Sequence, residues 1–88
     1  MIIELRRIGG DGSIRRIRLD TAGRDDAARW EQLVDLACLE VPPPYHPEPG
    51  EPVYQVRAGE QMTQIAESDL RGPLRELVTA VLAEGRAG

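Results

Sequence analysis

The strongest constraint on the fold is a pair of alternating segments that flank a loop made only of Gly, Asp and Ser. The segments are residues 2–8 and 14–19, and the loop between them reads GGDGS. Alternation of apolar and polar residues is typical of strands, whose successive side chains point to opposite faces. Antiparallel pairing that brings the apolar positions together matches residue 3 with 19 and residue 5 with 17. The centre of that pairing is residue 11, so the sequence predicts a β-hairpin with Gly9–Ser13 as its tip.

The same register predicts which side chains lie on the face of this hairpin that points away from the core. Glu4 is opposite Arg18, where we expect a cross-strand ion pair, and Arg6 is opposite Arg16, which brings like charges together. Arg7 and Arg15 also oppose each other, beyond the end of the core. The hairpin is therefore expected to project past the body of the protein with a basic stem.

Near the tip, the register places Ile8 opposite Ile14 on the outer face, where folding offers them nothing to pack on. The ordinary interpretation is a solvated edge with one stray apolar pair. The alternative is a docking element that enters a partner. The pattern alone leaves both open.

The rest of the chain predicts one helix, a second hairpin and another helix. Residues 24–39 carry an apolar stripe at helical spacing, made of Trp30, Leu33, Val34, Ala37 and Cys38. Residues 53–58 and 61–66 flank Gly59-Glu60, a dipeptide typical of a type II′ turn. Residues 72–84 carry a second stripe, with Pro73 at the first helical position and Gly85 as a C-cap.

The predicted order is ββαββα, within a single domain that spans residues 1–88. The Pro-rich segment 41–52 is expected to be a crossing loop within that domain, because prolines exclude both a helix and a central strand. Two hairpins with one-sided apolar faces need a cover, which two amphipathic helices can provide. We therefore predict an α+β fold with a four-stranded, largely antiparallel sheet covered by two helices. We also predict that Leu77 and Val81 are buried against the sheet together with Trp30 and Leu33.

The reactive side chains do not form a recognisable catalytic or metal-binding pattern. Cys38 is the only thiol and lies on the apolar stripe, so we expect it to be structural. His46 is the only histidine, so a resident zinc site is not expected. No carboxylate pair is distinguished by its spacing. We expect no enzyme activity, no cofactor and no metal.

The charge disfavours two classes of partner. The chain has a net charge of −4, whereas nucleic acids and anionic membranes require a basic footprint. The scarcity of aromatic residues also disfavours a binder of single-stranded nucleic acid, which uses stacking. No signal peptide or membrane span is visible, and we expect a cytoplasmic location.

The segment GGDGSIRRIRLD, Gly9–Asp20, resembles the emfourin family, whose members inhibit protealysin-like and other thermolysin-family zinc metalloproteases. The family pattern has a strand, a Gly-Gly tip, a small residue, an apolar residue and two arginines, and its second strand ends in Asp. Here Ser13 stands where the family usually has Gly, and Gly12 lies one place earlier. The middle helix, the Pro-rich loop, the hairpin VYQVRAGEQMTQI and the terminal helix PLRELVTAVL follow the same plan.

The resemblance implies reversible blocking of a thermolysin-like protease cleft by projecting loops. We infer that the loop that enters the cleft is the tip with its neighbours, and that the following residues contact the protease: Ile8, Gly9, Gly10, Asp11, Gly12, Ser13, Ile14 and Arg16. Weaker candidates are the loop residues Tyr45 and His46 and the turn at Gly59. The alternative from another class is a non-inhibitory interaction module that uses the same basic and apolar hairpin.

Overall fold

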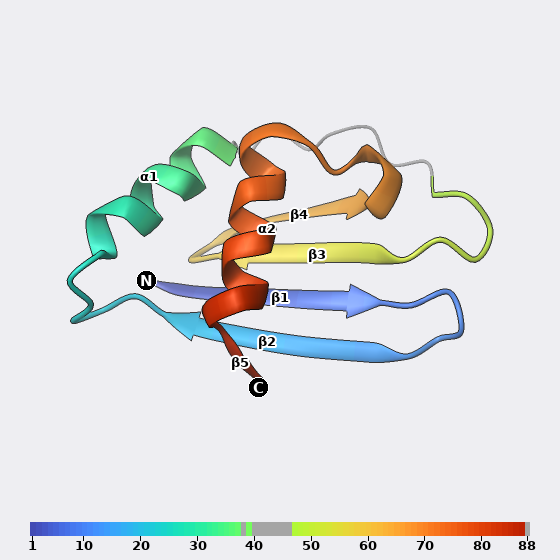
Figure 1. Cartoon of the computed structure of the whole chain (residues 1–88), viewed down its shortest axis with the longest axis horizontal. Coiled ribbons are helices and arrows are strands. Elements are labelled where there is room, and N and C mark those ends of the chain that lie inside the picture. The colour runs from blue at the N-terminus through green and yellow to red at the C-terminus, as the bar shows by residue number, and fades with distance from the viewer. Residues whose placement is uncertain (38, 40–46, 88) are drawn as a thin grey trace.

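The structure is a computed structural model, and it describes residues 1–37, 39 and 47–87. The elements follow the predicted ββαββα order, with a short 3₁₀ helix and a two-residue strand added (Figure 1). In chain order they are β1 (Ile2–Ile8), β2 (Ile14–Asp20), α1 (Ala27–Ala37), β3 (Val53–Ala58), β4 (Gln61–Ala66), η1 (Glu67–Asp69), α2 (Gly72–Glu84) and β5 (Arg86–Ala87).

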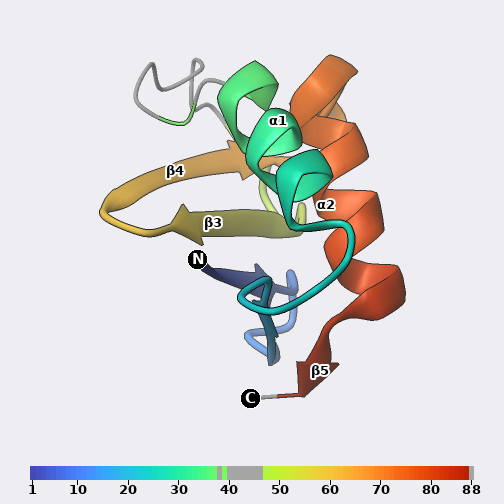
Figure 2. The same cartoon turned by 90° about the vertical axis from the view of Figure 1, so that its left-hand side faces the viewer.

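The strands form one antiparallel sheet in the order β4-β3-β1-β2-β5. Both helices pack on the same face of this sheet (Figure 2). The α+β fold with its antiparallel sheet and two covering helices is thus confirmed. Because β1 is central and pairs with β3, the start of β3 lies beside the end of β1, next to the tip of the first hairpin.

The registers of both hairpins agree with the predictions from the apolar pattern. In the first hairpin Ile3 pairs with Leu19, and in the second Ala58 pairs with Gln61. A one-residue slip in either hairpin would turn every apolar side chain to the wrong face. The burial pattern therefore specifies the register that the turn residues also favour.

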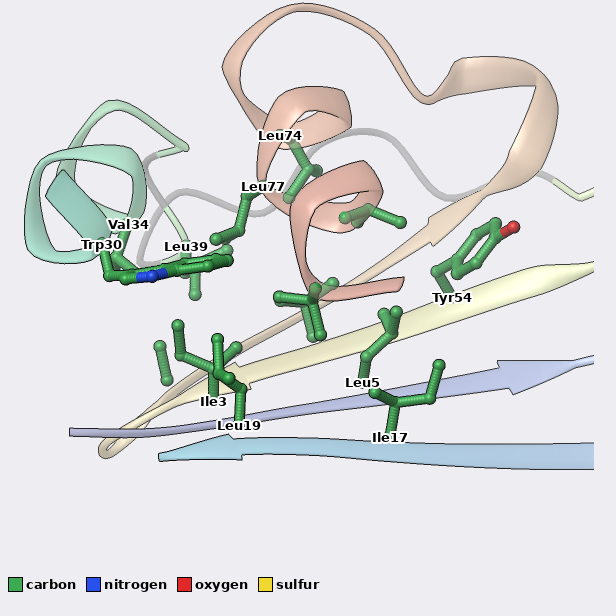
Figure 3. Close-up of a cluster of buried hydrophobic side chains, with 14 of the residues drawn as sticks. Ile3, Leu5, Ile17, Leu19, Trp30, Val34, Leu39, Tyr54, Leu74 and Leu77 are labelled. Carbon is green, nitrogen blue, oxygen red and sulfur yellow. The ribbon is translucent and has the colours of Figure 1, made fainter. Parts of the chain in front are cut away.

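The core lies between the sheet and the helices (Figure 3). Leu77 and Val81 are fully buried, and Trp30 is 2% exposed. Leu33 is only partly buried and packs against the buried cluster, so the prediction that it is buried is wrong. The buried cluster consists of Ile3, Leu5, Ile17, Leu19, Trp30, Val34, Leu39, Tyr54, Val56, Ala58, Ile65, Leu74, Leu77, Val78 and Val81.

Helix α1 begins at Ala27, later than the predicted residue 24, because a turn precedes it. The Arg24 N–H donates to the Thr21 carbonyl at 3.2 Å. The Arg24 side chain donates to Asp26 Oδ1 at 2.9 Å and to Glu84 Oε1 at 2.9 Å. These bonds tie the start of α1 to the end of α2. The predicted structural role of Cys38 lies outside the described residues.

Gly85 ends α2, but not through the left-handed conformation that a glycine C-cap usually adopts. Its backbone is extended, with φ of −74°. A Cβ at this position would lie 2.7 Å from the Val81 carbonyl oxygen and would also press on the Ile17 side chain. The glycine is thus needed for close approach to the sheet, where the chain continues into β5 and pairs with β2.

None of the described helices is long and apolar enough to cross a membrane.

Candidate functional site

The tip Gly9–Ser13 is closed by three short hydrogen bonds. The Gly9 N–H donates to the Ser13 carbonyl at 2.8 Å, and the Gly12 N–H donates to the Gly9 carbonyl at 3.0 Å. The Ser13 N–H donates to Asp11 Oδ1 at 2.9 Å, which is an Asx turn. Gly12 has a φ of +87°, a conformation that favours glycine. The GGDGS sequence therefore specifies one compact loop conformation.

Hydrogen bonding from the Ser13 side chain and backbone lowers the pKa of the Asp11 carboxyl below its ordinary value, and nearby Arg7 adds a small effect in the same direction. Hydrogen bonds to the charged form of an acid favour that form. The carboxylate that supports the tip is consequently ionised at neutral pH.

The tip rests on a second loop, at the end of the Pro-rich segment. A Cβ on Gly10 would lie 2.6 Å from the carbonyl carbon of Gly50 and 2.9 Å from its Cα, so the two backbones touch. The Gly50 loop is itself closed by a bond from the Glu51 N–H to the Glu48 carbonyl at 3.0 Å. The two loops lie together at one end of the molecule (Figure 1). Sequence reasoning missed this contact, which depends on β1 pairing with β3.

Ile14 is exposed beside the tip, whereas Ile8 is not free. Ile14 keeps 53% of its surface accessible. Ile8 is half-buried, since it lies between Ile14 on β2 and Val53 on β3. The expectation that both isoleucines lack packing partners is therefore wrong for Ile8. Arg16 is exposed and pairs with Arg6, two register pairs further from the tip than Ile14.

Arg7 braces the base of the tip on the other face of the sheet. Its Nε donates to the Tyr54 hydroxyl at 3.3 Å, and its Nη2 lies 3.5 Å from Glu67 Oε2. The guanidinium group also stacks 6.0 Å from the centre of the Tyr54 ring. The tyrosine hydroxyl, with Glu67, raises the pKa of Arg7. Alternation indicated which face Arg7 occupies, but not its partners, which belong to β3 and η1.

The weaker candidates do not join this site. Gly59 lies at the opposite ends of the strands, where its N–H donates to the Ile2 carbonyl at 3.3 Å. Tyr45 and His46 lie outside the described residues. Within the described part of the chain, no group of three or more His, Cys, Asp or Glu side chains is arranged to hold a metal ion.

The expected ion pair between Glu4 and Arg18 does not form. The two residues are register partners, but no ion pair joins them among the described residues. Glu4 also has Arg57 as its partner on the other side, in β3. A carboxylate between two long, solvated arginine side chains gains little from holding either one in place.

The chain was compared with known proteins. No protein-family model matches it, and no curated protein or solved structure matches it either. The resemblance to the emfourin family accordingly rests on residues 9–20 and on the order of the elements.

Proposed function

We propose that this protein reversibly inhibits a thermolysin-like zinc metalloprotease, and that the tip Gly9–Ser13 enters the cleft of that protease. The observation that carries the proposal is a hydrogen-bonded tip at one end of the molecule with Ile14, 53% exposed, beside it. The resemblance of residues 9–20 to emfourins supplies the class of target. In this proposal the chain blocks catalysis and performs none.

The bracing of the tip supports an inhibitory role. An inhibitor loop that is ordered before binding loses less conformational entropy when it binds. Here the order comes from the Asx turn at Asp11, from the contact between Gly10 and Gly50, and from the Arg7 bonds to Tyr54 and Glu67. Gly12 also allows a partner's backbone to come close, because it has no Cβ and no other atom lies within 4 Å of the place a Cβ would take.

Ile14 is the apolar anchor in this proposal. Thermolysin-family clefts, as the resemblance implies, accept bulky aliphatic side chains next to the scissile bond. Full burial of one such side chain is worth about 1.5–3 kcal/mol, or about ten- to a hundredfold in affinity. Arg15 and Arg16 would contact the rim of the cleft and would act mainly on the association rate and its salt dependence.

The test is inhibition of a thermolysin-like protease by the purified protein, with a serine protease as the control enzyme. The informative variant is Ile14→Ser, and Leu36→Ser is the matched control, since Leu36 on α1 is similarly exposed at 59%. We expect Ile14→Ser to weaken inhibition of the metalloprotease by about ten- to a hundredfold and Leu36→Ser to leave it unchanged. Melting temperatures of both variants establish that they are folded.

Two results would contradict parts of this proposal. If the parent protein binds the metalloprotease without inhibiting it, the alternative of a non-inhibitory interaction module is correct. If Ile14→Ser is folded and inhibits as strongly as the parent, the tip is not the inhibitory element.

A further inference from the structure

The face of the sheet that points away from the helices, hereafter the open face, is crossed by two rows of polar side chains. Register pairing across the five strands places five residues side by side in the first row: Met62, Arg57, Glu4, Arg18 and Arg86. The second row, one step nearer the tip, consists of Gln64, Gln55, Arg6 and Arg16. Both helices lie on the opposite side of the sheet (Figure 2). In the part of the chain that the structure describes, no helix covers the open face.

The arginines of the open face are exposed, and none of them is paired. No carboxylate among the described residues lies within ion-pair distance of any of the five. By contrast, Arg7 and Arg24, which lie elsewhere, each have a carboxylate partner. The open-face guanidinium groups therefore keep their donors available for a ligand. Arg6 and Arg16 even face each other across the strands, a placement that costs stability.

Charge is separated between the open face and the rest of the molecule. Asp20, the next residue of β2 after Arg18 on this side of the strand, is exposed on the open face as well. Five arginines against Glu4 and Asp20 leave the open face with three positive charges. The whole chain carries −4, so the remainder carries −7. A ligand that is attracted by the net charge of this protein would be cationic, whereas one that fits the open face is anionic. Binding at this face therefore needs local contacts with the arginines.

Four of these arginines line a hollow of about 560 Å³, together with Glu4 and Met62; the four are Arg6, Arg16, Arg18 and Arg57. Met62 is 54% exposed at one end of its row. Arginine stems and a methionine offer apolar surface between the charged groups. The hollow thus suits a ligand with both carboxylates and aliphatic side chains, rather than a simple inorganic anion.

The spacing of the arginines favours an extended peptide. Arg16 and Arg18 are alternate residues of one strand, which places their stems about 7 Å apart. Carboxylates on alternate residues of an extended ligand chain recur at the same interval. Single-stranded nucleic acid fits less well, because its binding sites usually offer aromatic rings for stacking. Trp30 and Tyr54 are both buried on the helix-covered side.

We propose that the open face binds an extended acidic segment of a partner protein, in which carboxylates alternate with aliphatic side chains. The guanidinium groups of Arg16, Arg18 and Arg57 receive the carboxylates, and Met62 contacts the aliphatic residues. This surface shares Arg16 with the rim proposed for the inhibitory site but does not include the tip Gly9–Ser13 itself, and it stands whether or not the protein inhibits a protease.

The experiment titrates the ¹⁵N-labelled protein with a short, end-blocked peptide of alternating Glu and Val and follows both backbone amides and arginine Nε–H signals by NMR. Two further arms use the same peptide with Gln in place of Glu and a short oligo-dT. The double variant Arg18→Gln/Arg57→Gln is compared with Arg29→Gln/Arg75→Gln, which removes two exposed arginines from α1 and α2. Protease inhibition is measured in parallel for both.

We expect the Glu-Val peptide to shift the signals of open-face residues in β1, β2 and β3, and the Gln peptide not to bind. The affinity for the Glu-Val peptide should be about three- to tenfold lower for Arg18→Gln/Arg57→Gln and unchanged for Arg29→Gln/Arg75→Gln. Inhibition through the tip should be unchanged. The proposal is overturned if the Gln peptide binds as well as the Glu-Val peptide, or if oligo-dT binds more tightly than it. It is also overturned if Arg29→Gln/Arg75→Gln loses as much peptide affinity as Arg18→Gln/Arg57→Gln, or if the latter variant loses protease inhibition along with peptide binding. If Arg18→Gln/Arg57→Gln has a lowered melting temperature, the peptide affinities of the single variants Arg57→Gln and Arg75→Gln are compared instead.

Discussion

Gly10 and Gly50 determine how the tip is held, because their backbones meet without side chains between them. Neither residue is near the other in the sequence, and a glycine at a hairpin tip is ordinarily explained by a left-handed φ. For Gly10 the reason is different: the space that a Cβ would occupy is taken by another loop. Residue-level reasoning from the sequence therefore predicted the glycine-rich tip correctly but not what the tip rests on.

We expect Gly10→Ala to separate the two loops and to reduce the free energy of unfolding by about 1–3 kcal/mol, as in other overpacked sites. Glu60→Ala, at the exposed turn of the other hairpin, is the control and should be nearly neutral. Denaturant unfolding measures both. A Gly10→Ala variant as stable as the parent would mean that the loops are not in contact in solution.

Asp11 makes the tip sensitive to strong acid. Its pKa is lowered from the ordinary value of 3.8, so its contribution to stability is fully present above pH 3.8 and is lost as the pH falls through the lower, folded-state pKa. NMR titration should show the Asp11 carboxyl and the Ser13 amide changing together below pH 3.8. In Asp11→Asn this titration of the Ser13 amide should vanish. A carboxyl that titrates at or above the ordinary value would be inconsistent with the Asx turn.

At the scale of elements, local patterns predicted both hairpin registers and the extent of α2, because apolar periodicity and turn residues point to the same answer. They failed where an element depends on a distant one. A turn at Arg24 precedes α1, and the side chain of Arg24 also binds Glu84, sixty residues later. Strand β5 is too short to give a pattern, and it forms only because Gly85 lets the chain approach β2.

Helix α2 packs against the sheet through one apolar stripe, and Leu77 is fully buried in that stripe. Leu77→Ala should lower the free energy of unfolding by about 2–5 kcal/mol, through lost burial and the cavity left behind. Thr79→Ala, on the exposed side of the same helix, should change it by less than about 0.5 kcal/mol. Equal effects of the two substitutions would place the core elsewhere.

For the whole molecule, the strand order is what sequence reasoning could not supply. Patterns determine which strands pair within each hairpin, but the choice of β1 rather than β2 as the neighbour of β3 depends on how the complete sheet packs. That choice brings Val53 beside Ile8 and the Gly50 loop beneath the tip. It also assembles five arginines from β1, β2, β3 and β5 on the open face, namely Arg6, Arg16, Arg18, Arg57 and Arg86.

The central position of β1 predicts a gradient of hydrogen exchange. Amides of Ile3–Ile8 are bonded within the sheet between β2 and β3, so they should exchange slowest, at the rate of global unfolding. Amides of β5 at the sheet edge should exchange fastest among the strands. Hydrogen-exchange NMR tests this order; faster exchange in β1 than in β4 would contradict the strand order.

The turn at Gly59 lies at the far ends of the strands from the tip, along a molecule whose longest dimension is 40 Å. A flexible tether inserted beside Glu60 would therefore leave the tip and its supporting loop clear of the attachment point. Molecules immobilised in this way would all stand with the same end outward, so that a sensor surface could display the tip in a single orientation.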